Sequence, residues 1–281
     1  MQTTNPSGPD LQKHSGVIPS TNPEGEETTN FGYKKVPSRE KGNWVRQHFD
    51  TVAQKYDLMN TLLSFGIHYL WKRKTINLLR LKPGDSVLDV CGGTGDLSIL
   101  ALKKMKGSGQ VILNDINRKM MVRGRDKSTH RAIRKKIEFV QGDAEKLPFE
   151  SDYFDAAMVG FGIRNLTRME EGFREMHRVL KPGGRFICLE FSNPTSPIFR
   201  HLYDFYSFHI MPLIGLLFVG SRQAYTYLPE SIRLFPSPDA LAHQLEDIGF
   251  RQVAYHTLTN GIAIIHMGLK NGATENNKPM V

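Results

Sequence analysis

Residues 86–96 read SVLDVCGGTGD, a short apolar run that leads directly into a glycine-rich turn. Pro83 and Gly84 stand just before the run and mark its start. An apolar segment of this length between turn residues is typical of a strand that is buried on both faces of a parallel sheet. A helical pattern follows from about Asp96 to Lys104. These residues therefore predict a buried strand, a tight turn and a helix in succession.

The same alternation continues through most of the chain. Further strands are expected at 111–113, 137–140, 154–159, 185–191, 251–257 and 263–269, and helices at 118–127, 169–180 and 238–248. Helical patterns at 43–63 and 69–79 predict an N-terminal helical cap. Strands that alternate with helices indicate the α/β class, with a doubly wound, mostly parallel, seven-stranded, Rossmann-like sheet. The two consecutive strands at the end predict one antiparallel member.

Composition divides the 281 residues into one folded domain and two tails. Residues 1–30 and 271–281 are rich in small and polar residues and are predicted to be disordered, which leaves 31–270 as the folded domain. Within it, residues 197–235 form an apolar insert before the last helix that is too long for an ordinary loop. This insert fits a lid, a wall of a binding site, a dimer face or ordinary core helices.

Several classes of protein are excluded or disfavoured by composition. The most apolar stretch, 210–219, has ten residues, so no membrane-spanning helix is expected. The first residues lack the pattern of a signal peptide, which favours a cytoplasmic location. Two cysteines and no Cys/His cluster predict neither a disulfide framework nor a metal site. The net charge of +9 suits an anionic partner, such as nucleic acid or a membrane surface, or simply a solvated basic surface.

The glycine-rich turn differs from the common phosphate-binding loops. Counting from Gly93, a dinucleotide fingerprint needs a third glycine where Ser98 stands, and the lysine of a P-loop is absent. The acidic residues Asp89 and Asp96 at its two ends also oppose phosphate. They suit a cationic or hydroxyl-rich ligand, which Gly93 and Gly95 would allow close to the backbone.

Polar residues follow the next strands at the same edge of the predicted sheet. Asp115 stands about 20 residues beyond the glycine turn, where an acidic residue accepts hydrogen bonds from ribose hydroxyls in nucleotide-binding folds. Asp143 follows the third strand and can accept from an adenine amino group, and residues 160–165 follow the fourth. Each feature alone has a structural alternative, such as a helix cap for Asp115. Together they predict a nucleoside site.

This constellation resembles the class I methyltransferases that use S-adenosylmethionine, and more closely the ubiquinone/menaquinone biosynthesis C-methyltransferase family. The resemblance covers about residues 30–270. It is carried by FGY at 31–33, VAQKYDLMN at 52–60, SFGIH at 64–68, WKR at 71–73, GGTGD at 92–96, AEKLPF at 144–149, FGIRN at 161–165, YDFYSFH at 203–209 and YLPESI at 227–232.

The resemblance implies a cofactor and a substrate. The cofactor would be S-adenosylmethionine, contacted by Thr94, Asp115, Asp143 and Ala144. The reaction would be C-methylation of a prenylated quinol: demethylmenaquinol, 2-methoxy-6-polyprenyl-1,4-benzoquinol, or both. Many family members have serine in place of Gly160, and that contact is lost here.

Other readings remain open for the substrate and for one cofactor contact. Tyr56 is expected at the methionine end of the cofactor, with packing as its alternative role. Another small phenol, a sterol or a tocopherol precursor is the alternative substrate. Nucleic acid is disfavoured because the chain has no appended RNA-binding domain and no Asn/Asp-Pro-Pro-Tyr motif.

Methylation at a ring carbon requires that a neighbouring hydroxyl lose its proton, and three residues are candidates to assist. Arg164 can hydrogen-bond the oxyanion or orient a water, but its alternative role is a structural pair with a carboxylate. His209 and His68 are the candidate bases, because histidine titrates near neutral pH, although either can be structural.

A prenylated substrate also implies contact with a membrane. The apolar insert suits the prenyl tail, and Lys72, Arg73 and Lys74 of the helical cap can attract an anionic surface. We therefore expect peripheral contact with the inner face of the membrane. A homodimer is left open.

Overall fold

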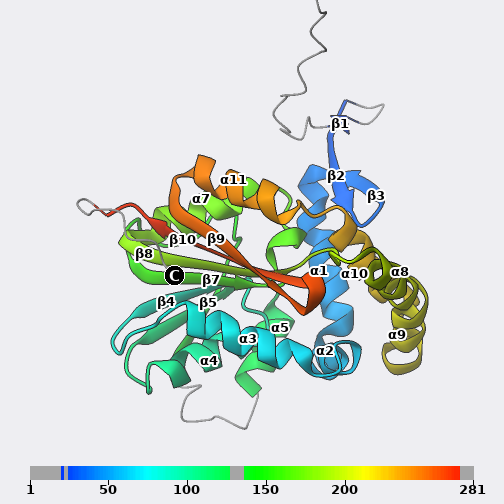
Figure 1. Ribbon diagram of the computed structural model, residues 1–281, viewed down its shortest axis with the longest axis horizontal. Helices are drawn as coiled ribbons and strands as arrows, with labels where there is room; N and C mark the ends of the chain where they lie inside the picture. The colour runs from blue at the N-terminus through cyan, green and yellow to red at the C-terminus, as the bar shows by residue number, and fades with distance from the viewer. Residues whose placement is uncertain (1–19, 22–24, 127–135, 273–281) are drawn as a thin grey trace, which may run out of the picture.

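A computed structural model describes residues 20–21, 25–126 and 136–272 (Figure 1). Its main sheet has seven strands in the order β6-β5-β4-β7-β8-β10-β9. Their bounds are β4 Ser86–Val90, β5 Gln110–Asp115, β6 Ile137–Gln141, β7 Phe154–Gly160, β8 Leu180–Phe191, β9 Phe250–Leu258 and β10 Ala263–Lys270. β10 pairs antiparallel with both β8 and β9, and the other pairs are parallel. The predicted fold class is confirmed, including the single reversed strand.

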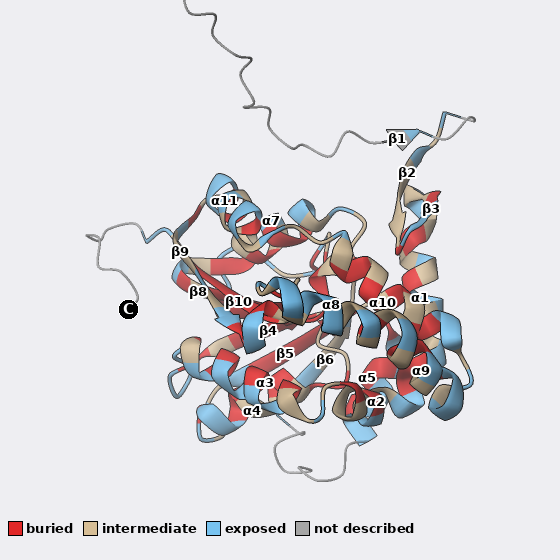
Figure 2. Cartoon of the chain, turned by 45° about the vertical axis from the view of Figure 1, so that its right-hand side comes forward, coloured by how far each residue is buried: buried red, intermediate tan, exposed pale blue. Residues whose placement is uncertain are grey.

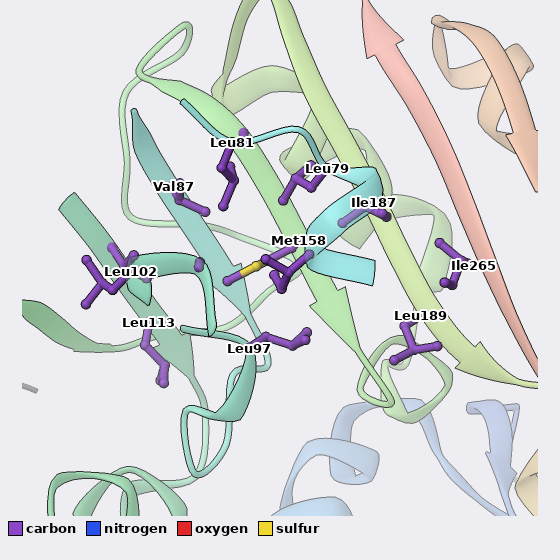
Figure 3. Packing of buried hydrophobic residues seen from close by; sticks show 14 of the residues in the cluster. Leu79, Leu81, Val87, Leu97, Leu102, Leu113, Met158, Ile187, Leu189 and Ile265 are labelled. Carbon is purple, nitrogen blue, oxygen red and sulfur yellow. The ribbon is translucent and has the colours of Figure 1, made fainter. Parts of the chain in front are cut away.

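The sheet lies between two layers of helices. Helices α3 Ile67–Leu78, α4 Asp96–Lys104 and α5 Arg118–Asp126 lie on one side, and α7 Met169–Val179 and α11 Pro238–Ile248 lie on the other (Figure 1). Neighbouring strand residues point to opposite faces. Thus Val87 packs under α3 and α4, as Figure 3 shows, whereas Leu88 packs under α7 and α11. Both side chains are fully buried, which explains why the strand reads as an unbroken apolar run.

Two predicted boundaries in these layers are wrong. The predicted helix 43–63 is divided into α1 Lys41–Val52, a 3-10 turn at Ala53–Lys55 and α2 Tyr56–Leu63. β8 begins at Leu180 rather than at residue 185, since Phe154 pairs with Leu180 before the register shifts. The Pro-Gly-Gly segment that was expected to precede the strand lies within it.

The predicted N-terminal tail extends too far into the chain. Strands β1 Ser20–Thr21, β2 Glu27–Phe31 and β3 Lys34–Pro37 form a small antiparallel sheet, so residues 27–30 belong to a strand and not to a disordered segment. Phe31 anchors this sheet by stacking on Tyr227, with ring centroids 4.3 Å apart. Of the remaining predicted tail residues, 1–19, 22–24 and 273–281 lie outside the described residues.

The insert is helical, as expected, but it is more continuous than the sequence indicated. It comprises α8 Pro197–Phe205, a π-helical turn Tyr206–Ile210, α9 Met211–Val219 and α10 Arg222–Arg233. The first three run together as one 23-residue helix, Pro197–Val219, in which an 18-residue stretch has a mean hydropathy of 1.5. This helix is long and apolar enough to cross a membrane by length and composition. The expectation that no helix spans a membrane stays a prediction, because length and composition alone do not show that this one does. The π-helical turn lies just before Pro212, where the missing N–H would otherwise interrupt the helix.

The insert, the helical cap and the small N-terminal sheet gather at one end of the main sheet (Figure 1). This is the end where the parallel strands have their carboxyl termini. Many residues of α8 and α9 remain exposed (Figure 2).

Candidate functional site

Two adjoining cavities lie at the carboxyl ends of the strands. The strand-end cavity, of about 430 Å³, is lined by the loops after β4, β5, β6 and β7 and by the N-terminal segment. The insert cavity, of about 330 Å³, lies between the helical cap, the insert and the ends of β7 and β8. Phe49, Tyr56 and Phe161 line both cavities, so the two share a wall.

Asp115 is fixed at the centre of the strand-end cavity. Its Oδ2 accepts the N–H of Gly93 at 2.8 Å, and its Oδ1 accepts the N–H of Asn117 at 2.7 Å. Burial raises the pKa of Asp115 to about 6, against the effect of these two hydrogen bonds. The carboxylate thus joins the glycine turn to the loop after β5. Each oxygen keeps a lone pair that a ligand hydroxyl can use.

The other expected cofactor residues divide into two groups. Gly93, Asp143, Ala144 and Tyr56 line the strand-end cavity. Asp143 accepts the N–H of Glu145 through Oδ1 at 2.9 Å. Gly93 has a φ of +56°, a conformation that a residue with a side chain rarely adopts.

Thr94 and Gly95 line neither cavity. The Thr94 hydroxyl donates to Oδ1 of Asp57 at 2.7 Å, which holds α2 against the glycine turn. Gly95 supplies the left-handed residue at which α4 begins. The expected contact of Thr94 with a cofactor stays a prediction, and in this arrangement both residues shape the turn.

The acidic residues at the ends of the turn are also engaged by the protein. Asp89 accepts from the N–H and the hydroxyl of Ser98, and burial raises the pKa of Asp89 to about 7. Asp96 pairs with Lys72 at 2.6 Å. The expected cationic or hydroxyl-rich ligand stays a prediction, but these two carboxylates already have partners in the protein. Lys72 is buried in this pair, which also removes it from the residues expected to attract a membrane.

Arg164 lines the insert cavity and forms a buried ion pair with Glu190. Nη1 donates to Oε1 of Glu190 at 2.6 Å and to the carbonyl of Phe161 at 2.7 Å. Nε donates to the hydroxyl of Ser231 at 3.3 Å, and the guanidinium lies 5.4 Å from the ring centre of Phe191. Within the described chain, Nη2 has no acceptor. Arg164 is therefore both a structural ion pair and a donor with one nitrogen left for a ligand.

The two candidate histidines have different environments. His68 is buried, lines the insert cavity and shares a 2.6 Å hydrogen bond with the hydroxyl of Ser64. His209 is exposed, stacks on Phe205 and hydrogen-bonds the Phe205 carbonyl at 3.2 Å. It lines neither cavity, so the structure does not support His209 as a base.

Two residues of the site were missed by sequence reasoning. Glu190 stands at the end of the fifth parallel strand, a position that could have identified it by the rule that found Asp115. His48 lines the insert cavity, and burial together with the charge of Arg164 lowers the pKa of His48 to about 4. Its imidazole is thus neutral and a weak base. No pattern in the sequence distinguishes it from an ordinary helix residue.

Comparisons with known proteins agree with this geometry. The model of the ubiE/COQ5 methyltransferase family matches residues 35–270. The ubiquinone/menaquinone biosynthesis C-methyltransferase UbiE of Pseudomonas fluorescens is 48% identical over 247 residues, which are 88% of this chain and 96% of that protein. The enzyme of the same name from Pseudomonas putida (strain W619) is 49% identical over 245 residues, 87% of this chain and 96% of that one.

Solved structures of more distant proteins share the fold. A SAM-dependent methyltransferase from Thermotoga maritima has a TM-score of 0.56 at 17% identity and covers 80% of this chain and 99% of its own. Phosphoethanolamine N-methyltransferase 2 of Haemonchus contortus, in complex with S-adenosyl-L-methionine, has a TM-score of 0.51 at 14% identity over 72% of this chain and 52% of its own. At such low identity these two establish the fold alone. The family model and the near-half identity go further: this chain belongs to the ubiE/COQ5 methyltransferase family.

Proposed function

We propose that this protein transfers the methyl group of S-adenosylmethionine to a ring carbon of a prenylated quinol. The observation that carries the proposal is the pair of cavities with a shared wall: a strand-end cavity with acidic acceptors adjoins an apolar, aromatic-lined insert cavity. A methyl donor in the first would meet a flat ring in the second at Phe49, Tyr56 and Phe161. The names of the related UbiE enzymes support the same reaction.

The strand-end cavity fits a nucleoside without phosphate. Asp115 offers acceptors for ribose hydroxyls, and Asp143 offers one for an adenine amino group. The two arginines that line the cavity are engaged by carboxylates: Arg39 pairs with Glu26 and Arg168 with Glu145. Since both arginines are already paired, a phosphate-bearing dinucleotide would find little to balance its charge. The aromatic faces of the shared wall are favourable neighbours for a sulfonium cation.

The bound cofactor supplies an electrophilic methyl group. A ring carbon would bond to that methyl as the carbon–sulfur bond breaks, and the electron pair of that bond would stay on sulfur. The ring carbon would then lose its proton to water as the ring becomes aromatic again, and the quinol oxygen would take back the proton held by the base. The protein must hold carbon, methyl and sulfur in line and must stabilise the oxyanion that activates the ring.

Arg164 and His68 are the residues of this chain suited to the second task. Nη2 of Arg164 can donate to the quinol oxygen as it gains charge, which is an interaction that strengthens in the transition state. Of the histidines lining the insert cavity, His68 and His48, only His68 is suited as a base, because the pKa of His48 is about 4. We assign the proton-accepting role to His68.

We further propose that the protein meets its substrate at a membrane surface. Phe65 and Leu202 line the insert cavity and are 77% and 64% exposed, so the cavity opens between apolar side chains. Further exposed apolar residues extend from this opening along α8 and α9: Ile198, Phe205, Leu213, Leu216, Leu217 and Phe218. The opposite face of this helix packs on α2 and α10 through Met211, which favours a helix lying on a bilayer over one spanning it.

Two experiments test these proposals. Methyl-labelled S-adenosylmethionine is incubated with purified protein and either a demethylnaphthoquinol or a methoxybenzoquinol, and the label is followed into the ring by mass spectrometry. Transfer to neither quinol would refute the activity. For membrane contact, flotation with vesicles containing anionic lipid should be reduced by Leu216→Ser with Leu217→Ser but not by Val122→Ser, which is an exposed apolar site on α5. The proposed membrane contact would be contradicted if the wild-type protein did not float with the vesicles. It would also be contradicted if the protein were a dimer whose interface is this face.

A further inference from the structure

We propose that Glu190 is a positioning residue for methyl transfer, which fixes the Arg164 guanidinium so that Nη2 faces the quinol oxygen in the insert cavity. This inference rests on the proposed function. It assigns the ion pair as a unit, and not the arginine alone, to the activation of the ring.

Glu190 holds Arg164 at two points. Its Oε1 accepts from Nη1 at 2.6 Å and from the N–H of Phe191 at 2.8 Å. Its Oε2 accepts the backbone N–H of Arg164 at 3.4 Å. The carboxylate therefore fixes both the side chain and the main chain of the loop after β7 to the end of β8. Because hydrogen bonds hold Nη1 in place, the planar guanidinium has little freedom to rotate.

A third element completes the arrangement. Ser231 of α10 accepts from Nε, and its hydroxyl donates onward to the carbonyl of Leu228 at 2.8 Å. Arg164 is thus held by its own loop, by β8 and by the insert. These contacts engage Nε and Nη1, so Nη2 is the nitrogen that remains available to a ligand.

Burial and charge explain why a carboxylate is needed. The side chains of Arg164 and Glu190 are only 7% and 1% exposed, so leaving either charge without its partner would be strongly destabilising. The methyl donor is itself a cation in the adjoining cavity. An arginine balanced by Glu190 can approach the reacting ring without the repulsion that a lone positive charge would add. Glu190 lines neither cavity, so it acts through Arg164 and does not touch the ring.

Two substitutions are compared. Each keeps the negative charge of one buried ion pair and changes the length of the acidic side chain by one methylene. Glu190→Asp shortens the Arg164 pair. Asp85→Glu lengthens the pair of Asp85 with Arg185, which is also 2.6 Å long and mostly buried but lies at the amino end of β4, away from both cavities. Both variants should lose stability. Only Glu190→Asp should lower kcat, by about tenfold or more, because a shift of about 1 Å can cost up to 100-fold.

The kinetic pattern separates positioning from a merely structural role. For Glu190→Asp, the calorimetric Kd for S-adenosylmethionine and the KM for quinol should stay within about twofold of the wild type. In an Arg164→Lys background, Glu190→Asp should add little further loss, because residues that act as one unit are not additive. A wild-type kcat in Glu190→Asp, an equal kcat loss in Asp85→Glu, or multiplicative losses in the double variant would each overturn the proposal.

Ser231→Ala provides a second variant that leaves the ion pair intact if Glu190→Asp does not fold. Loss of the acceptor for Nε should lower kcat by about threefold or more while cofactor binding is preserved. An unchanged kcat would refute the positioning argument. If neither the wild type nor any variant methylates a quinol, although each is folded and binds the cofactor, the proposed function fails. If the wild type is active and the variants keep its kcat, only the positioning role fails.

Discussion

Asp89 lies at the centre of the fold, and replacing it with asparagine should stabilise the protein in a pH-dependent way. Asp89 is 1% exposed, and within the described part of the chain its carboxylate accepts hydrogen bonds only from Ser98. Burial raises the pKa of Asp89 from 3.8 to about 7, despite the two bonds from Ser98 and the charge of Lys72. The folded protein therefore holds a proton at pH values where the unfolded chain has lost it.

The sign and the size of the effect follow from this pKa. Below about pH 4 Asp89 is protonated in both states and costs nothing. As the pH rises toward 7, the unfolded chain releases this proton, whereas the folded state must keep it or bury a charge. The free energy of unfolding therefore falls. Above pH 7 it stays about 4 kcal/mol below its low-pH value. Asp89→Asn removes this loss, because an amide oxygen can still accept from Ser98. Its NH₂ group needs a new partner, which costs about 1–3 kcal/mol at every pH. We therefore expect a net gain of about 1–3 kcal/mol at pH 8 and a net loss of about 1–3 kcal/mol at pH 4.

Urea unfolding of the cofactor-free protein at pH 4, 6 and 8 measures this difference. Glu175→Gln is the control with the opposite sign. The hydrogen bonds from Arg178 lower the pKa of Glu175, so its contribution is present above the unfolded pKa and lost as the pH falls. The glutamine variant should be less stable than the wild type at pH 8 and should approach it at pH 4. If Asp89→Asn changes stability equally at all three pH values, burial of the charge is not the cause.

Three further predictions concern the site. Asp115→Ala should weaken S-adenosylmethionine binding by about 1.5–3 kcal/mol in calorimetry, and unchanged affinity would exclude a ribose contact. A chain that begins at Lys34 should bind the cofactor more weakly and melt at a lower temperature than one that begins at Gly25, because it lacks β2, whose Glu27 lines the strand-end cavity; equal behaviour of the two chains would refute this. His68→Ala should lower kcat by about 100-fold at saturating substrates, whereas His209→Ala should not, and the reverse order would show that His209 reaches the ring during turnover.

The main sheet could be predicted because its determinants are local. A strand buried on both faces is an apolar run, and glycines and prolines mark its ends, as at 86–90 and 154–159. β2 could not be predicted in this way, since its sequence, Glu-Thr-Thr-Asn-Phe, is mostly polar. Its stability comes from partners far along the chain: Phe31 stacks on Tyr227, and the N–H of Tyr33 donates to Glu230 at 3.0 Å.

The site was predictable to the level of position but not of side-chain direction. Parallel strands end at one edge, so Asp115, Asp143 and Arg164 were expected near one another. Asp115 and Asp143 line the strand-end cavity, and Arg164 lines the adjoining insert cavity. Thr94 stands at an equally suitable position, but its hydroxyl points to Asp57. The direction of a side chain in a tight turn depends on local dihedral angles and on the neighbouring helix. The same limit explains why His209, within an aromatic stretch, faces outward.

The distribution of charge around the cavities shows why a basic protein can serve a neutral, apolar substrate. The cations named at the two cavities are paired: Arg39 with Glu26, Arg164 with Glu190, and Arg168 with Glu145, while Lys72 at their edge pairs with Asp96. Among the described residues, Asp115 and Asp143 form no ion pair. The strand-end cavity is therefore slightly negative, which favours a cationic methyl donor, whereas the insert cavity is balanced. The side chains named at the cavities therefore do not account for the net charge of +9, and recognition at the reacting centre does not depend on it.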